Sequence, residues 1–298
     1  MTDLDNTTAP TLGVVLERLN SLYPPQLAEE WDKAGLAVGN LSAPVRKIYF
    51  AMDAVTQTID EAIEWGADLI FTHHPFVFSP LPAVVTSDDR GANIHKLIRA
   101  SCAVFSAHTN GDSARGGVND VLALLLGLRG TRPMVPSLSD ESLGLGRVGQ
   151  LPAPVTLRDF ADSVSRALPE TAQGIRVSGD PNKVISTVAV LGGSGGSLIS
   201  DAVASGADVY VTSDLKHHDM LDFLEAQRNH FMEQGQTYEA ASKSTMAVVD
   251  TAHFASESPW LATAARTVSA VLAGSGWSVE TKVSDINTDP WTFAPARG

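Results

Sequence analysis

The chain has 298 residues, of which 44% are hydrophobic and 18% charged, a balance that favours a compact globular protein and excludes a disordered one. Its 34 acidic and 21 basic residues give a net charge of −13, which disfavours binding to nucleic acid or to an anionic membrane. Because Cys102 is the single cysteine, an intrachain disulfide and a Cys-x-x-Cys metal site are excluded.

Short apolar runs alternate with amphipathic stretches along most of the chain. In chain order they predict a helix over 11–23, a strand over 47–54, a helix over 56–65, a strand over 67–72, a helix over 93–101, a strand over 103–107, a helix over 116–127, a helix over 155–168, a strand over 186–193, a helix over 195–205, a strand over 207–212, a helix over 217–227, a strand over 246–252 and a helix over 259–274. This alternation predicts an α/β fold with a parallel or mixed sheet covered by helices on both faces.

The second half of the sequence repeats the plan of the first. Residues 58–72, TIDEAIEWGADLIFT, align without a gap with residues 198–212, LISDAVASGADVYVT, and both contain Gly-Ala-Asp. Further on, each half ends a predicted strand with Ala-His and places a carboxylate four residues later. These pairs are His108 with Asp112 and His253 with Glu257. We interpret the pattern as an internally duplicated α/β unit.

The domain boundaries follow from this repeat and from a change in composition. Pro and Gly are frequent from about 130 to 185, which predicts turns and a boundary. We therefore place the first domain at 1–130 and the second at 131–245. The C-terminal segment 246–298 is expected to complete the first domain.

Possible metal donors gather at the predicted strand ends, where ligands bind in open α/β sheets. They are His73, His74, His108, Asp112, His253 and Glu257. Imidazole nitrogen combined with carboxylate oxygen suits Zn, Fe, Mn, Co or Ni better than Ca or Mg. A single tetrahedral ion needs fewer donors, so the set favours two ions that share a carboxylate. The adjacent pair of histidines is then predicted to span both ions.

Each of these motifs has a simpler interpretation when it is taken alone. The pair His73 and His74 is more often a surface feature or a hydrogen-bonded pair than a metal site. His218 begins a predicted helix, where it either faces the substrate or lies in a solvated first turn capped by Asp214. The stretch GGSGGS over 192–197 lacks the lysine of a Walker loop, so it is interpreted as a tight turn, with a phosphate cradle as the alternative.

Four ordered blocks give the chain a family resemblance: THHPFVFSPL, AHTNGDSARGGVND, TSDLKHHDMLD and DTAHFASESPW. Together with EEWDKAGLAVGN near the start, they resemble the NIF-three-like dinuclear-metal family, whose bacterial members carry the name GTP cyclohydrolase I type 2 homologue. The resemblance spans nearly the whole chain. It departs at Ser213 and Ala252, where glycine is usual in the family.

The resemblance implies two related three-layer α/β domains with a metal site in the cleft between them, and a toroidal homohexamer built as a trimer of dimers. It also implies two divalent metal ions per chain, of a kind drawn from Zn, Fe, Mn, Co and Ni. The implied metal ligands are His73, His74, Asp112, His253 and Glu257, with Glu257 as the bridge. His108 is then a neighbour of the ligands in the pocket.

These expectations favour a metal-dependent hydrolase acting on a nucleotide-like small molecule, and the resemblance suggests GTP with ring opening. His108 and His218 are the candidate catalytic residues, because imidazole exchanges protons near neutral pH. The alternative is a hexamer that handles metal or acts as a scaffold without catalysis. Neither a signal peptide nor a membrane span is predicted, so the expected location is the cytoplasm.

Overall fold

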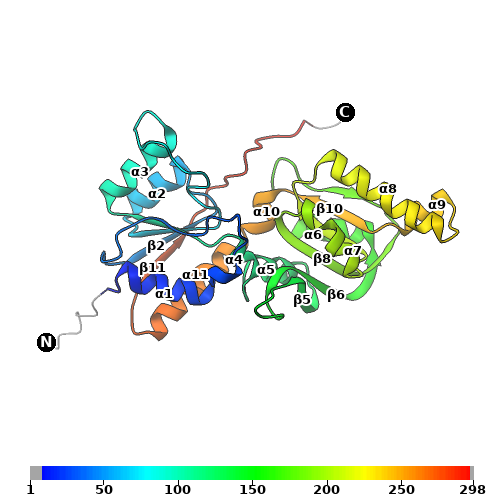
Figure 1. Ribbon diagram of the computed structural model, residues 1–298, viewed down its shortest axis with the longest axis horizontal. Helices are drawn as coiled ribbons and strands as arrows, with labels where there is room; N and C mark the ends of the chain where they lie inside the picture. Colours follow the sequence, from blue (N-terminus) through cyan, green and yellow to red (C-terminus); the bar gives the residue numbers. More distant parts are fainter. Residues whose placement is uncertain (1–8, 296–298) are drawn as a thin grey trace. The chain divides into compact units, whose positions relative to one another are not determined.

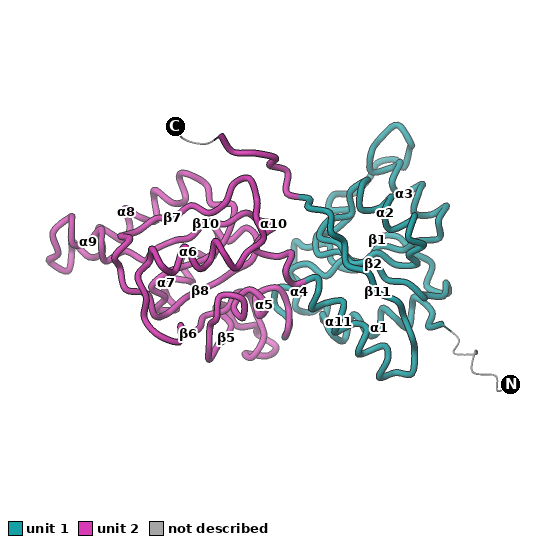
Figure 2. Tube along the Cα trace, turned by 180° about the vertical axis from the view of Figure 1, so that it is seen from behind, with its two compact units in different colours: residues 1–115, 261–288 teal, residues 116–260, 289–298 magenta. Residues whose placement is uncertain are grey.

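The chain folds into two compact units, which Figures 1 and 2 show. The computed structural model describes residues 9–295; the start of the chain, where no signal peptide is predicted, lies partly outside the described residues. Unit 1 comprises Met1–Arg115 and Leu261–Thr288, and unit 2 comprises Gly116–Trp260 and Asp289–Gly298. The sequence-based boundaries placed 116–130 and 246–260 in the first domain, whereas both segments pack with unit 2. The segment 246–260 packs with unit 2 because the strand Ala247–Thr251 pairs within the sheet of that unit.

Unit 1 is a three-layer α/β structure around a five-stranded sheet of order β1-β4-β3-β2-β11. Its strands are β1 (Gly35–Val38), β2 (Lys47–Ala51), β3 (Leu69–Thr72), β4 (Ala103–Ser106) and β11 (Glu280–Val283). All neighbours are parallel except the edge strand β1, which is antiparallel to β4. In Figure 1, helices α2 (Thr56–Trp65) and α3 (Asp89–Ala100) cover one face, and α1 (Leu12–Leu22) and α11 (Trp260–Gly274) cover the other. Because both faces are covered, every residue of β3 and β4 is buried.

Unit 2 is also layered, around a six-stranded sheet of order β5-β6-β8-β9-β10-β7. Its strands are β5 (Arg129–Pro136), β6 (Gly144–Thr156), β7 (Arg176–Ser178), β8 (Val184–Ser194), β9 (Val209–Ser213) and β10 (Ala247–Thr251). One apolar cluster joins the sheet to α5 (Val118–Leu125), α6 (Leu157–Ala167) and α10 (His253–Glu257). A second cluster joins it to α7 (Ile199–Ala204) and α8 (His217–Glu233). The short helix α9 (Tyr238–Ser244) follows α8.

The segment from 130 to 185 differs from the prediction of turns around one helix. It contributes the strands β5, β6 and β7 as well as helix α6. Pro133 lies inside β5, which is tolerated because β5 is an edge strand of its sheet. Gly146 takes a left-handed conformation inside β6, with φ of 62°. The helix itself begins as expected, since the Thr156 hydroxyl accepts a hydrogen bond from the backbone N–H of Asp159 at 3.1 Å.

The two units share local details at the positions that the sequence repeat aligns. Gly66 after α2 and Gly206 after α7 are both left-handed, with φ of 81° and 79°. The carboxylates of Asp68 and Asp208 each accept hydrogen bonds from two consecutive backbone N–H groups of the neighbouring strand region. The distances are 2.6 and 3.0 Å in unit 1, and 2.8 Å for both in unit 2. These equivalences support the internal duplication, which stays a prediction.

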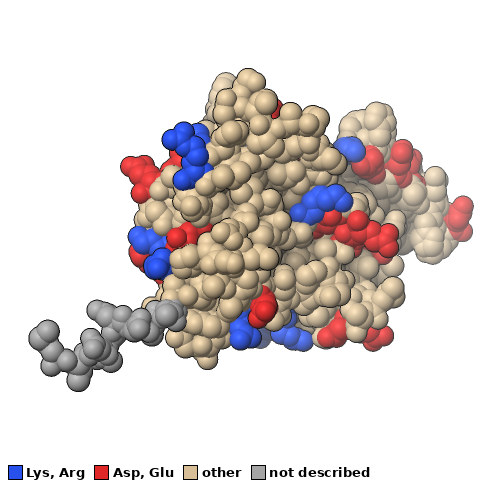
Figure 3. Space-filling view, turned by 60° about the vertical axis from the view of Figure 1, so that its left-hand side comes forward, with Lys and Arg blue, Asp and Glu red and all other residues tan. Residues whose placement is uncertain are grey.

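The charged surface fits the acidic composition. The face drawn in Figure 3 carries Lys and Arg singly or in small groups beside Asp and Glu, without a continuous basic patch on that face. Among residues 9–295, none of the helices combines the length and the apolar composition that a membrane-spanning helix requires.

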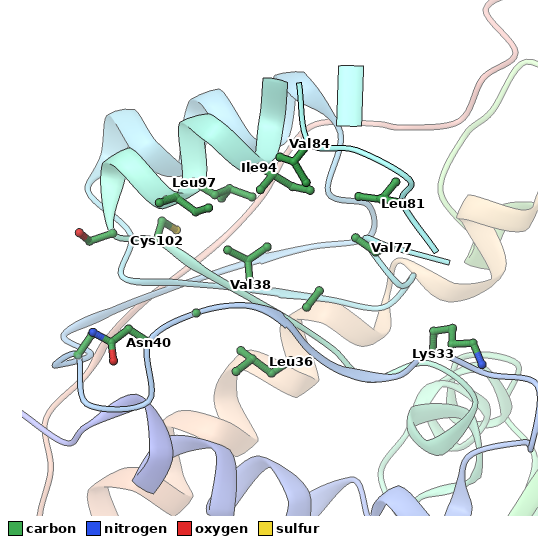
Figure 4. A pocket seen from close by; sticks show the side chains of 15 residues that line it. Lys33, Leu36, Val38, Asn40, Val77, Leu81, Val84, Ile94, Leu97 and Cys102 are labelled. Carbon is green, nitrogen blue, oxygen red and sulfur yellow. The ribbon is translucent and has the colours of Figure 1, made fainter. Parts of the chain in front are cut away.

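A cavity of about 850 Å³ lies in unit 1 between the edge strand β1, helix α3 and the loop that follows His74. Figure 4 shows apolar side chains converging on it, with Leu97 and Ile94 facing Val38. No histidine or carboxylate is among its lining residues, so this cavity is separate from the candidate metal donors. Cys102 lies at its wall.

Cys102 is expected to be unreactive in the folded protein. Its side chain is 2% exposed, and burial, with a smaller effect of the Asp68 charge, raises the pKa of the thiol to about 12. The group is therefore a neutral thiol throughout the ordinary pH range, with roughly a thousandfold less thiolate than a free cysteine. Native protein treated with iodoacetamide at pH 8 should show almost no mass shift, and denatured protein should be alkylated completely. Fast labelling of the native chain would contradict this.

Candidate metal centre

Three histidines of unit 1 lie together at one edge of its sheet. His73 and His74 directly follow β3, and His108 follows β4 and precedes the short helix α4 (Thr109–Ser113). Because β3 and β4 are parallel neighbours, their carboxyl ends meet at the same edge. Ring nitrogens of the three histidines, one from each, lie within 4.8 Å of one another. The strand-end positions thus bring together the imidazoles that the sequence singled out in this unit.

Each of these rings is held through its Nδ1 atom. The acceptors are the Ala107 carbonyl for His73 at 2.9 Å, the Asp53 carboxylate for His74 at 2.7 Å and the Asp32 carboxylate for His108 at 2.8 Å. A carbonyl or a carboxylate only accepts, so Nδ1 donates in every case. The lone pair of each neutral ring is then at Nε2, the arrangement typical of metal-binding histidines.

Asp32 holds more than the His108 ring. Its carboxylate also accepts hydrogen bonds from the backbone N–H of Thr109, at 3.0 Å, and from the Thr109 hydroxyl. Burial alone would raise the pKa of Asp32, but the hydrogen bonds from His108 and Thr109 outweigh it and hold the pKa well below its usual range. Asp32 is therefore an anion at neutral pH, fixed between the start of α4 and the loop before β1.

Asp112 adds a carboxylate to the imidazoles of unit 1. It lies one helical turn after His108, and its Oδ1 atom is 3.7 Å from Nε2 of His73. Asp112 is 7% exposed and His73 is fully buried. Such a buried pair of a nitrogen and an oxygen donor is suited to a divalent transition metal.

In unit 2, His253 and Glu257 occupy the two ends of α10, just beyond β10. Their spacing of four residues places both on one face of the helix, with Nε2 of His253 3.1 Å from Oε2 of Glu257. Nδ1 of His253 donates to the Asp214 carboxylate at 2.6 Å. Burial lowers the pKa of His253, but the two carboxylates outweigh this effect and raise the pKa to about 11.

The stretch GGSGGS leaves room for the Glu257 carboxylate. A Cβ atom on Gly193 would lie 2.2 Å from Oε1 of Glu257 and 3.2 Å from Nε2 of His253, and Gly193 has φ of 71°. The Gly193 N–H donates to the Ser256 hydroxyl at 2.9 Å. A glycine is therefore required at this position of β8 by close approach to the candidate ligands and by the left-handed backbone conformation.

His218 lies in the first turn of α8, is exposed and contacts the ring of His217, with ring centroids 5.1 Å apart. It is not a member of the candidate metal groups found among the described residues. Asp214 does not cap this helix, because the N-cap residue is Lys216 and the Asp214 carboxylate binds His253 instead. The substrate-facing role of His218 stays a prediction.

Three carboxylates that hold the rings were not predicted from the sequence: Asp32, Asp53 and Asp214. Asp53 could have been found from the sequence, because it follows a predicted strand and therefore lies at the same sheet edge as His74. Asp32 was visible only as part of the block EEWDKAGLAVGN, and Asp214 was considered only as a helix cap.

The chain is therefore an α/β protein of two units. Its strand-end histidines, whose Nδ1 atoms are held by hydrogen bonds, and its buried carboxylates form groups that could hold a metal ion. Comparison with family models agrees with this class. Residues 10–235 match the model of Duf34/NIF3 (NGG1p interacting factor 3), and the chain belongs to this family. The match confirms the family resemblance seen in the sequence blocks.

Named relatives and solved structures cover nearly the whole chain. The GTP cyclohydrolase 1 type 2 homolog of Streptomyces coelicolor is 41% identical over 285 residues, covering 95% of this chain and 94% of that protein. The protein of the same name from Clostridium perfringens is 33% identical, covering 95% and 99%. A crystal structure of a Bacillus cereus protein related to NIF3 has a TM-score of 0.83 at 26% identity, covering 97% of this chain and all of that one. The α/β fold predicted from the sequence is thereby confirmed.

Proposed function

We propose that the protein is a dinuclear-metal-dependent hydrolase of a nucleotide-like small molecule. The observation that carries the proposal is the common orientation of the unit 1 imidazoles, whose Nδ1 atoms are all engaged by fixed acceptors. Three rings oriented alike beside a buried carboxylate suit a metal site far better than a set of histidines placed only for packing.

The proposed ligands come from both units and follow the family resemblance. They are His73, His74, Asp112, His253 and Glu257, with Glu257 shared between two divalent ions drawn from Zn, Fe, Mn, Co and Ni. The donor chemistry fits such ions, because neutral imidazole and carboxylate are their usual protein ligands. When bound, the ions would supply Lewis-acid polarisation of the substrate and activation of water near neutral pH.

His108 is held in the same way as the proposed ligands His73 and His74. This favours a role as a further metal ligand over the proton-transfer role predicted from the sequence. His218 is then the remaining candidate for proton transfer, because it is exposed at the start of α8 and follows Asp214, the partner of His253, by four positions.

The choice of the first substrate rests on the relatives, which carry the name GTP cyclohydrolase 1 type 2 homolog. Metal-loaded protein would be incubated with GTP and with a panel of phosphoesters and cyclic amides, and the products separated by chromatography. We expect metal-dependent turnover that is lost in Glu257→Gln and kept in Glu64→Gln, a change at an exposed position of α2. If no compound turns over with Zn, Mn, Co or Fe, the hydrolase proposal fails and a metal-handling or scaffold role replaces it.

We further propose that the chain assembles into the toroidal hexamer implied by the family resemblance. Helix α8 spans 17 residues without a fully buried one, and its side chains Leu221 and Met232 are 44% and 42% exposed. The two side chains are eleven positions apart, about three helical turns, so they lie on one face of α8 and offer an apolar surface for contact with another chain. Sedimentation equilibrium of the purified protein would give the assembly mass, and a monomer at micromolar concentration would contradict the proposal.

A further inference from the structure

Two large aromatic side chains of unit 1 are exposed beside the candidate metal donors. Trp31 is 54% exposed and Phe78 is 50% exposed. Single exposed apolar residues are common on proteins, but a neighbouring pair of aromatic rings next to a cluster of histidines is not explained by that general rule.

The two rings contact each other, and Trp31 also contacts His108. The centroids of Trp31 and Phe78 are 6.0 Å apart with an interplanar angle of 45°, so the pair forms an open angle. The edge contact of Trp31 with the His108 ring has a centroid distance of 5.9 Å and an interplanar angle of 81°. This leaves much of the indole surface open to solvent, directly beside a ring of the metal-donor cluster.

The loop that carries the indole is held by the neighbours of Trp31 in the chain. Asp32, the next residue, binds His108 and Thr109, and the backbone N–H of Glu29 donates to the Thr109 hydroxyl at 2.9 Å. The loop that carries Trp31 is therefore tied to the start of α4 at two points. A rigid aromatic side chain loses little conformational freedom when a ligand binds to it.

We propose that Trp31, supported by Phe78, is a stacking platform for the planar heteroaromatic ring of the substrate. The proposal rests on the proposed function, because it places the ring of a nucleotide-like molecule next to the metal-donor cluster. Stacking on an indole recognises the flat π-face that every such ring presents, without reading its hydrogen-bonding edge. The platform therefore selects for a planar ring as a class and contributes binding energy that is independent of metal content.

Replacing Trp31 by Ala should weaken binding of ring-containing ligands by roughly tenfold to a hundredfold, whereas Trp31→Phe should restore most of the affinity. Phe78→Ala should have a smaller effect in the same direction. In a turnover assay the change should raise KM and leave kcat nearly unaltered, because stacking acts equally before and during the reaction. Trp291→Ala is the matched control, since that indole is 66% exposed and lies in the C-terminal segment.

Affinity would be measured on metal-loaded protein by equilibrium dialysis, with GTP and guanosine as aromatic probes and ribose 5-phosphate as the probe without a ring. We expect Trp31→Ala to lose affinity for GTP and guanosine but not for ribose 5-phosphate. The aromatic probes should also quench the tryptophan fluorescence of the wild type, and Trp31→Phe should largely abolish this quenching. Metal content, measured in parallel, should equal that of the wild type in every variant.

Several outcomes would overturn the platform. The platform is refuted if wild type and Trp31→Ala bind the aromatic probes with equal affinity. It is also refuted if the wild type binds neither these probes nor any of a panel of purines, pyrimidines and pterins. Dissociation of an oligomer in Trp31→Ala would assign the rings to a contact between copies of the chain instead. Turnover is not needed for this test: ring-dependent binding without turnover refutes the hydrolase alone, and turnover unaffected by Trp31→Ala refutes the platform alone.

Discussion

Glu257→Gln is expected to remove at least one of the two proposed metal ions from each chain. Glu257 is 3% exposed, lies 3.1 Å from Nε2 of His253 and is proposed to bridge both ions. Glutamine has nearly the same shape but carries no negative charge, and its amide is a poor ligand for a transition metal. We therefore expect the metal affinity to fall by more than the roughly 10–100-fold that is typical for loss of an outer hydrogen-bond partner.

The fold should survive this substitution. Glutamine keeps the shape of the side chain and Asp214 still pairs with the His253 ring, so the metal-free variant should fold. It should melt below the metal-free wild type, because the amide removes the ion pair between Glu257 and His253. Metal per chain would be measured by elemental analysis after dialysis against metal-free buffer, with Glu64→Gln as the control for a surface glutamate. A Glu257→Gln protein that keeps two ions per chain would refute the proposed bridging role.

The positions of the unit 1 donors could be predicted because local sequence determines them. His73 and His108 end short apolar runs that form buried parallel strands, and strand ends in such sheets share one edge. The spacing of four residues between His253 and Glu257 was visible in the sequence, but the short helix α10, which places both on one face, was not predicted. The sequence pattern over a few residues was sufficient to place His73 and His108, because both side chains lie at the end of a regular strand.

The carboxylates that orient the rings could not be predicted in the same way. Asp32 binds a histidine 76 positions away, and Asp214 binds one 39 positions away. No periodic pattern connects residues so distant in the sequence, since their contact is made by the tertiary fold. Strands β5 and β6 were missed because Pro and Gly indicate turns locally. The edge strand β5 tolerates Pro133, and the inner strand β6 accommodates Pro152 and Pro154 where its pairing with β8 is irregular between Gln150 and Val155.

Asp53→Ala is expected to weaken metal binding by about 10–100-fold although Asp53 is not a proposed ligand. Its Oδ1 atom accepts from Nδ1 of His74 at 2.7 Å, and its Oδ2 atom accepts from the hydroxyl of Thr288. Removing the carboxylate frees the His74 ring to rotate and allows its Nδ1 and Nε2 tautomers to interchange. It also removes a negative charge that makes the ring a stronger donor.

A graded series separates these two effects. Asp53→Asn keeps an oxygen acceptor for His74 but loses the charge, so its metal affinity should lie between those of the wild type and Asp53→Ala. Thr288→Val removes only the second support of the carboxylate and should have a smaller effect than either. Asp60→Asn, at a carboxylate that is 52% exposed and paired with Lys96, serves as the surface control.

Affinities would be measured by competition with a chromophoric chelator, which requires no enzymatic turnover. The expected order of affinity is wild type and Asp60→Asn highest, then Thr288→Val, then Asp53→Asn, with Asp53→Ala lowest. If Asp53→Ala binds metal as tightly as the wild type, His74 either is not a ligand or needs no orienting partner. Because the other two carboxylates hold their rings in the same way, that result would also remove the reason for expecting Asp32 and Asp214 to matter.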